Sequence, residues 1–256
     1  MLLAVVPAVP QEPIRIAVND PRPVAAAVTA IEKHFGRAIT YEDTRYIHPS
    51  DIVDITDRIS RSPDKSKRLF GMRWGAIEVS LVPRSATTEG QIEELLAAVL
   101  AEHTKAGNTG EFRVEAGAGV HHVIPLAFKD ESGATSRLTP ALDVPITLAR
   151  REQSAYEAIQ STLAAVTEAS GMPLEPGTGT WGNLFFQRRV TLEAHNEPAR
   201  SVLWRLLQSI KPDLSWKLFC GAGDDRHCAF NIHAIRPNPR PSPSRLRAFQ
   251  LPASSF

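Results

Sequence analysis

Four segments of the chain repeat apolar residues at intervals of three and four, the spacing that places them on one face of an α-helix. In the last of these segments, Val202, Leu203 and Leu206 belong to such a stripe, which ends before Pro212. A glycine follows each of the other three, as is typical of helix C-termini. The predicted helices span residues 23–35, 89–103, 152–170 and 197–210.

Shorter runs rich in β-branched and apolar residues separate the helices and predict strands. They cover 14–18, 38–41, 76–82, 111–115 and 120–126 in the first half, and 145–148, 172–175, 189–194, 214–220 and 229–235 in the second. A helix with a single apolar stripe covers one sheet face. We therefore expect an α+β fold in which each half is a mixed sheet with two helices on one face.

The two halves resemble each other in their order of elements. Each predicts a βαβ unit followed by a βαββ unit, and each final hairpin contains Gly-Ala-Gly, at 117–119 and 221–223. The offset between the halves is about 110 residues, close to a domain length. We interpret this as an internal duplication into two similar βαβ-βαββ modules. Chance similarity of two mixed modules is the alternative.

Both halves also lead from strand to helix through Asn, an acid and Pro, starting at Asn19 and at Asn196. These Asn side chains are predicted helix N-caps, and the prolines stand where no N–H is required. Neither stretch has the glycines of a phosphate-binding loop, so we favour helix starts over ligand binding. In the second helix, Thr88 and Gln91 predict a capping box.

Changes in composition along the chain suggest domain limits. The predicted divisions are a first module at 12–129 with a polar insertion near 46–74, a second module at 141–235, and a tail at 236–256. Residues 130–140 are the predicted linker. Within the insertion, Ile52, Ile55 and Ile59 have the spacing of a short amphipathic helix. The tail is rich in Pro and Arg, and we expect it to be disordered.

Composition and charge exclude some classes of function. The 256 residues are 43% hydrophobic and 22% charged, as in ordinary globular proteins. A net charge of +1 gives no general attraction to nucleic acid. No apolar run reaches the roughly 18 residues that suggest a membrane-spanning helix. We therefore predict neither a nucleic-acid partner nor a membrane span.

The N-terminal residues 1–11 are apolar, and no Lys or Arg precedes them. They are similar to the end of a signal peptide without its basic start, with Val6 and Ala8 as small residues before a cleavage site. A Pro-containing lead-in to the first strand is the alternative. We expect a periplasmic or secreted protein, or otherwise a cytoplasmic one.

Two cysteines, Cys220 and Cys228, flank the Gly-rich turn of the last predicted hairpin. This spacing suits partners across a hairpin, where opposed Cβ atoms come within disulfide range. A disulfide follows if the protein is exported, and two packed thiols if it is cytosolic.

Motifs that carry chemistry are absent. The chain has no G-x-S-x-G, no H-E-x-x-H and no phosphate-binding loop. Adjacent acids such as Glu42 and Asp43 are more typical of a solvated face than of an acid–base pair. We predict no catalytic, cofactor-binding or metal-binding residues and no cofactor.

Several histidines are candidate metal ligands. His121 and His122 are neighbours in a predicted strand and so point to opposite faces. A metal site of Asp225, His227 and Cys228 is conceivable, but acids are equally common in turns.

An aromatic segment follows Gly-Thr-Gly-Thr in an irregular stretch of the second half. Exposed apolar residues there would mark a contact surface. The candidates are Trp181, Leu184, Phe185 and Phe186. The alternative is a loop whose aromatic residues fold back onto the sheet.

Residues 14–43 contain a strand, a helix that begins at Asp-Pro, a Gly and a strand that ends in Tyr-Glu-Asp. This arrangement resembles the small N-terminal domain shared by secretins and TonB-dependent receptors. Residues 190–207, followed by 214–218 with Leu-Ser-Trp, look like the same βαβ element. The chain departs from the family in its long insertion and in lacking a following barrel or pore segment. The resemblance implies an envelope-side protein-interaction module without catalytic residues.

Two hypotheses follow. The first is a non-enzymatic, exported interaction or scaffold protein of the bacterial envelope, built from duplicated modules of this kind, with a protein partner. The second is a hydrolase with a His/Asp site at the last hairpin or between the modules. His195, His227 and His233 discriminate between them, because a catalytic site would have to bring such groups together.

Overall fold

The computed structural model describes residues 12–59, 68–117, 119–177, 182–223 and 227–236. The first half contains β1 (Ile14–Asp20), α1 (Pro23–Phe35), β2 (Ile39–Glu42), β3 (Ile52–Asp54), α2 (Thr56–Ile59), β4 (Phe70–Met72), β5 (Gly75–Leu81), α3 (Thr88–Lys105), β6 (Glu111–Gly117), β7 (Val120–Lys129) and β8 (Thr135–Arg137). The second contains the 3₁₀ turn η1 (Ala141–Asp143), β9 (Pro145–Ser154), α4 (Ala155–Ser170), β10 (Leu174–Pro176), α5 (Asn183–Gln187), β11 (Arg189–Pro198), α6 (Ala199–Ile210), β12 (Leu214–Cys220) and β13 (Cys228–Ala234).

The four predicted helices are present as α1, α3, α4 and α6, and their apolar stripes are buried. The prediction of their caps was wrong. The N-cap positions of α1 and α6 are Arg22 and Pro198, and neither has a side-chain cap. Asn19 and Asn196 are not caps, because β1 and β11 continue through them. Strand pairing therefore took precedence over the local capping signal.

Side-chain caps occur at the other two long helices. Thr87 caps α3 by accepting a hydrogen bond from the backbone N–H of Gly90, so the box predicted from Thr88 and Gln91 is absent. At α4, Ser154 and Glu157 form a capping box that the sequence reading missed.

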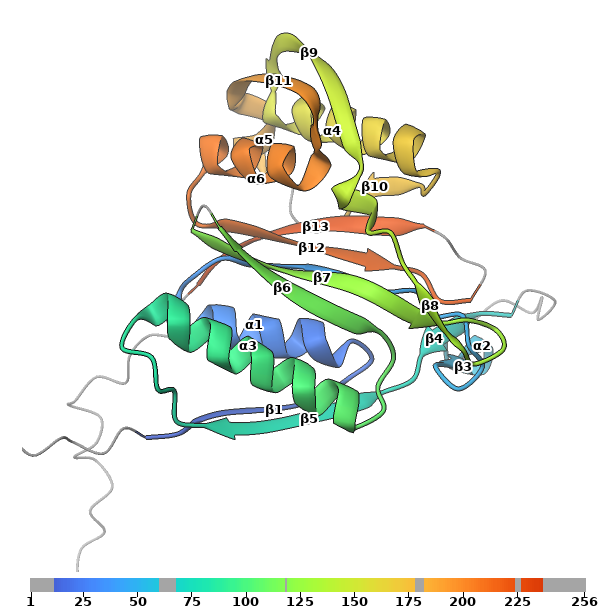
Figure 1. The fold of residues 1–256 in the computed structure, drawn as a ribbon. Coiled ribbons are helices and arrows are strands. Elements are labelled where there is room, and N and C mark those ends of the chain that lie inside the picture. Colours follow the sequence, from blue (N-terminus) through green and yellow to red (C-terminus); the bar gives the residue numbers. More distant parts are fainter. Residues whose placement is uncertain (1–11, 60–67, 118, 178–181, 224–226, 237–256) are drawn as a thin grey trace, which may run out of the picture.

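A mixed sheet joins both halves (Figure 1). Its strand order is β10-β13-β12-β2-β7-β6, and β8 pairs with β7. The two halves meet where β12 pairs in parallel with β2, with Leu218 opposite Glu42. The predicted linker 130–140 contains β8 and so contributes to this sheet.

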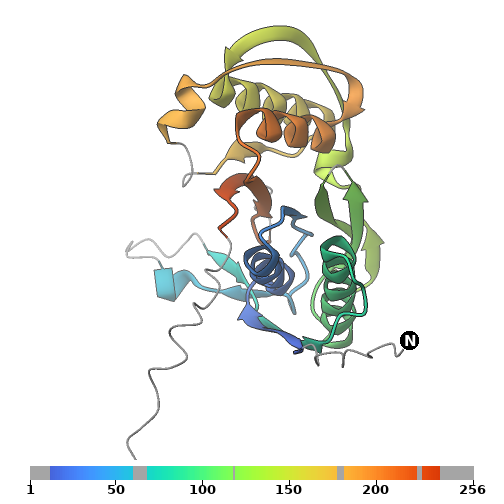
Figure 2. The ribbon, with the colours of Figure 1, turned by 90° about the vertical axis from the view of Figure 1, so that its left-hand side faces the viewer.

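The long helices of the two halves lie on opposite faces of the sheet (Figures 1 and 2). Side chains of β12 alternate between these faces. Trp216 and Leu218 belong to the core around α4 and α6, whereas Phe219 packs against the core around α1 and α3. Each half thus places two long helices on one face of a mixed sheet, which confirms the predicted α+β class.

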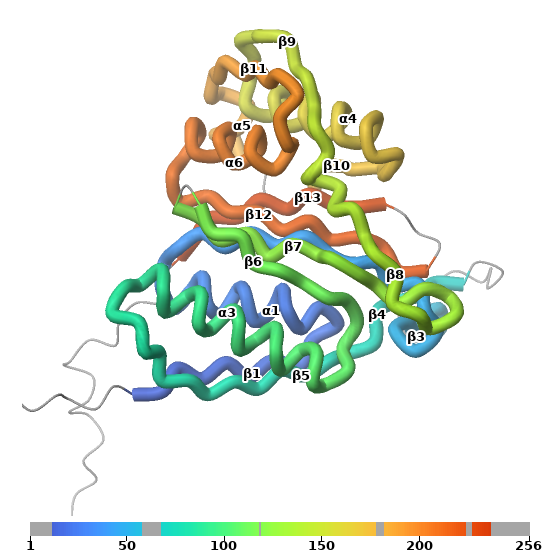
Figure 3. The backbone as a smooth tube through the Cα atoms, viewed as in Figure 1, coloured from blue at the N-terminus to red at the C-terminus, as the bar shows by residue number. Residues whose placement is uncertain are grey.

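A two-stranded ribbon covers the outer side of each helix pair (Figure 3). Antiparallel β1 and β5 cover α1 and α3, and antiparallel β9 and β11 cover α4 and α6. The directions of the strand pairs also match. In the first half, β2 is parallel to β7 and β6 is antiparallel to β7. In the second half, β10 is parallel to β13 and β12 is antiparallel to β13. The two halves share a topology, and their origin by duplication stays a prediction.

In the polar insertion, β3 and β4 pair as two antiparallel strands, and the short α2 lies between them in the chain. Ile52 therefore lies in a strand, and the amphipathic helix predicted through Ile52, Ile55 and Ile59 was wrong at its start. Residues 1–11 and 237–256, which include the proposed signal-peptide end and most of the predicted tail, lie outside the described residues.

Candidate binding cleft between the two halves

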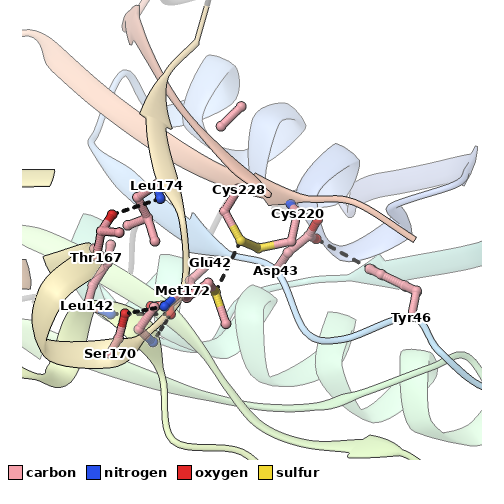
Figure 4. The surroundings of a disulfide bond; sticks show 12 residues. Glu42, Asp43, Tyr46, Leu142, Thr167, Ser170, Met172, Leu174, Cys220 and Cys228 are labelled. Carbon is pink, nitrogen blue, oxygen red and sulfur yellow. Dashed lines mark hydrogen bonds between the residues drawn. A yellow bond between two sulfur atoms is a disulfide. The ribbon is translucent and has the colours of Figure 1, made fainter. Parts of the chain in front are cut away.

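A cleft of about 400 Å³ opens where the two halves meet. Its walls come from the end of β2, the insertion, the segment after β8, the end of α4 and the turn between β12 and β13. Figure 4 shows part of this wall, with Glu42, Asp43, Tyr46 and Met172 around the Cys220–Cys228 pair. Segments distant in sequence therefore build this cleft together.

Asp43 connects β2 to the hairpin of the second half. Its carboxylate accepts hydrogen bonds from Arg22 Nε at 2.6 Å, from the backbone N–H of Cys220 at 3.0 Å and from the Tyr41 hydroxyl at 2.7 Å. Burial raises the pKa of Asp43, and the Arg22 guanidinium offsets only part of that rise. The carboxylate is thus occupied by structural contacts.

Glu42 makes the matching connection on the other face of β2. Its Oε1 accepts from the backbone N–H of Ala141 at 2.6 Å, and its Oε2 pairs with Arg200 of α6. Arg200 also contacts Asp143 at 2.9 Å and lies over the Trp216 ring, 5.7 Å from its centroid. Burial raises the pKa of Glu42, and Arg200 opposes that rise.

These contacts correct the interpretation of Glu42 and Asp43 as a solvated pair. Both residues are almost fully buried, at 2% and 3% exposure. Neighbours in a strand point to opposite faces, and each carboxylate here meets a different arginine. The two acids therefore do not act on one substrate atom as an acid–base pair.

The disulfide forms one wall of the cleft (Figure 4). Cys220 and Cys228 stand opposite each other in the β12–β13 register and are bonded. Met172 Sδ lies 3.2 Å from Cys228 Sγ, a contact that brings the end of α4 against the hairpin. A bonded Cys228 supplies no thiolate to the metal site considered with His227, and Asp225 lies outside the described residues.

His121 and His122 point to opposite sheet faces, as expected. His121 Nε2 lies 3.8 Å from Glu93 of α3, whereas His122 Nδ1 lies 2.6 Å from Thr40 Oγ1. Burial lowers the pKa of His122 to about 4, with a further lowering by Arg200.

The three histidines that discriminate between the hypotheses have different carboxylate neighbours. The pairs are His195 with Glu193, His227 with Glu175, and His233 with Glu32. None of the three lines the cleft. In the part of the chain that the structure describes, no group of three or more His, Cys, Asp or Glu could hold a metal ion.

Sequence reasoning missed a second ionic cluster at the joint between the halves. Glu32 Oε2 accepts from Lys217 Nζ at 2.8 Å and lies 3.0 Å from His233 Nε2, while Glu32 Oε1 accepts from the Ile39 N–H at 3.0 Å. Burial acts to raise the pKa of Glu32, but His233 and Lys217 outweigh it and leave that pKa lowered. No local pattern connects residues so far apart in the chain.

The residues of the predicted contact surface differ in their exposure. Leu184 and Phe186 are exposed, at 43% and 52%, and the Phe186 ring lies 4.7 Å from that of Tyr156. Phe185 is buried at 3% and belongs to the core of the second half, as in the alternative of aromatic residues that fold back. Trp181 lies outside the described residues.

Apolar side chains are also exposed in the insertion and beside it. Leu69 and Phe70 are 41% and 40% exposed and Trp74 is 62% exposed. Phe70 lines the cleft, where its ring lies near Gly223. Sequence reasoning treated this segment as a polar insertion and did not single out these side chains.

Comparison with protein-family models, curated proteins and solved structures finds no match for the chain. Among the described helices, none is both long and apolar enough to cross a membrane.

Proposed function

We propose that this chain is a non-enzymatic, exported protein-interaction or scaffold protein of the bacterial envelope, and that its cleft holds a segment of a partner protein. The observation that carries the proposal is the cleft between the halves, whose two buried carboxylates are both engaged by arginines. Catalysis needs a nucleophile or base with an unoccupied reacting position. Binding needs only a shaped and partly apolar surface.

The cleft has the properties of a binding site. Its volume of about 400 Å³ falls in the range typical of ligand sites, which often form where two structural units meet. Ile52, Phe70, Leu138 and Met172 supply apolar surface, and Arg45 adds a charge at an exposed position. The ion pairs of Asp43 and Glu42 hold the walls of the cleft in place before binding, so binding requires little ordering of the protein.

Export is supported by the disulfide, because such bonds persist in oxidising compartments and are rare in the cytosol. An interaction role in the envelope is supported by the resemblance of residues 14–43 and 190–218 to the N-terminal domain of secretins and TonB-dependent receptors. In this proposal, the joined sheet presents both modules as one unit.

Site-specific photo-cross-linking tests the function. A photoreactive phenylalanine analogue replaces Phe70 in the cleft or Val82, which is 46% exposed and does not line the cleft. We expect a discrete cross-linked partner from the envelope fraction at position 70 and none at 82. Filling the cleft with Met172→Trp should remove the product.

Equal labelling at both positions, or labelling that survives Met172→Trp, would contradict binding in the cleft. An activity screen provides the second test. Substrate turnover that vanishes in His227→Ala with an unchanged melting curve would instead establish the hydrolase hypothesis.

A further inference from the structure

Strand β6 forms one edge of the mixed sheet. Among the described strands it pairs with β7 alone, over residues Glu111–Gly117. In Figure 1 it lies along the front of the sheet. The outward N–H and C=O groups of an edge strand can pair with another chain.

The protein already fills the corresponding edge in its second half. Strand β12 occupies the place that β6 has in the first half, since each follows a long helix and pairs antiparallel with the next strand. Strand β2 docks in parallel on the outer edge of β12. This internal joint is a template for strand addition at β6.

A side chain completes that joint. Glu42 of the docked strand reaches Arg200, the second residue of α6. The second residue of α3 is instead Glu89, and Glu93 follows one turn later. The charge at this place is therefore opposite in the first half.

Glu89 and Glu93 are exposed near the end of β6. Their side chains are 56% and 55% exposed, and they line a hollow of about 260 Å³ with Ala116 and Gly117. The Arg37 guanidinium lies 3.5 Å from Glu89, so this carboxylate already attracts a cation. His121 lies 3.8 Å from Glu93, and burial lowers its pKa.

We propose that the β6 edge binds an extended segment of a partner protein as an added parallel strand, with a Lys or Arg side chain directed to Glu89 and Glu93. The inference rests on the proposed interaction function and adds a second, charge-selective contact to the cleft. Backbone hydrogen bonds would supply affinity, and the basic side chain would supply selectivity.

A second copy fits this edge less well. The opposite edge of the sheet is β10, which has three residues. It contains Pro176 and follows Pro173, and neither residue has a backbone N–H to donate. A head-to-tail repeat of the β12–β2 joint would therefore lack backbone donors at these two positions.

Two synthetic peptides test the inference. Each copies residues 38–44, which include the docked strand β2, and one of them carries Glu42→Lys. Amide NMR of the intact protein should show shifts at residues 112–117 with the Lys peptide, bound about tenfold more tightly than its parent because a repulsion becomes an attraction.

Variants of α3 identify the recognising groups. Glu89→Gln combined with Glu93→Gln should abolish the preference, whereas Glu168→Gln at an exposed position of α4 should preserve it. Equal binding of the peptides, shifts confined to the cleft, or no binding of either would overturn the proposal. So would a dimer, seen by sedimentation without peptide, that the α3 variant dissolves, because it would assign the edge to a second copy.

Failure of this inference and failure of the proposed function give different results. Cross-linking at Phe70 that is unaffected by the α3 variant, with no peptide preference, would leave the cleft function standing alone. Peptide selectivity at β6 without any cross-link at Phe70 would support strand addition at the β6 edge and would contradict binding of a partner in the cleft.

Discussion

Replacing His122 by Phe should remove most of the acid sensitivity that this residue confers on folding. The ring lies between the halves, with its centroid 6.3 Å from that of Trp216 and 6.4 Å from that of Trp204. Its Nδ1 lies 2.6 Å from the Thr40 hydroxyl, and burial lowers its pKa to about 4. Phe retains an aromatic ring of similar size but does not titrate.

The lowered pKa determines the sign of the effect. In the unfolded chain a His has a pKa of about 6.5. Between pH 6.5 and 4 the unfolded state binds a proton that the folded His122 does not, so stability falls as the pH falls through this window. Using these two pKa values, the loss relative to high pH is about 2 kcal/mol at pH 5 and about 3 kcal/mol at pH 4.

Chemical denaturation at pH 7, 6, 5 and 4 measures the effect. At pH 7 His122→Phe should be less stable by about 1–3 kcal/mol, because the buried Thr40 hydroxyl loses its partner. That difference should shrink by about 3 kcal/mol at pH 4. His195→Phe, at a side chain that is 75% exposed, is the matched control for the substitution of His by Phe. Parallel profiles for wild type and His122→Phe would refute the reasoning.

Three other predictions test the packing of the second half. Arg200→Met should cost about 3–5 kcal/mol in chemical denaturation because it leaves a buried carboxylate without its cation, and a cost below about 1 kcal/mol would contradict that burial. Reduction of Cys220–Cys228 should lower stability by about 2–3 kcal/mol, whereas two free thiols in unreduced peptides of exported material would contradict the bond. Phe185→Ala should cost about 3–5 kcal/mol and Phe186→Ala below about 1 kcal/mol, so equal losses would contradict their different burial.

Local periodicity was sufficient to predict the helices and most of the strands. A stripe such as that of α6 depends on residues three and four apart, which determine both the helix and the face that it buries. The predicted strand at residues 214–220 agrees with β12 for the same reason. The α+β class and the common order of elements in the two halves follow from this local information. The wrongly predicted caps of α1 and α6 show its limit, because β1 and β11 extend through Asn19 and Asn196.

Only the tertiary structure decided how the halves meet and what that contact creates. The parallel pairing of β12 with β2 places Arg200 beside Glu42, 158 residues away in the chain, and Lys217 beside Glu32. Two separate modules would satisfy the same local apolar pattern, so periodicity does not distinguish them from a joined sheet. The buried Glu42 and Glu32 do, because each loses its hydration on folding and takes its cationic partner from the other half. The cleft is lined by Glu42 from the first half and by Cys220 and Cys228 from the second, so its lining depends on the joint between the halves and not on any motif along the chain.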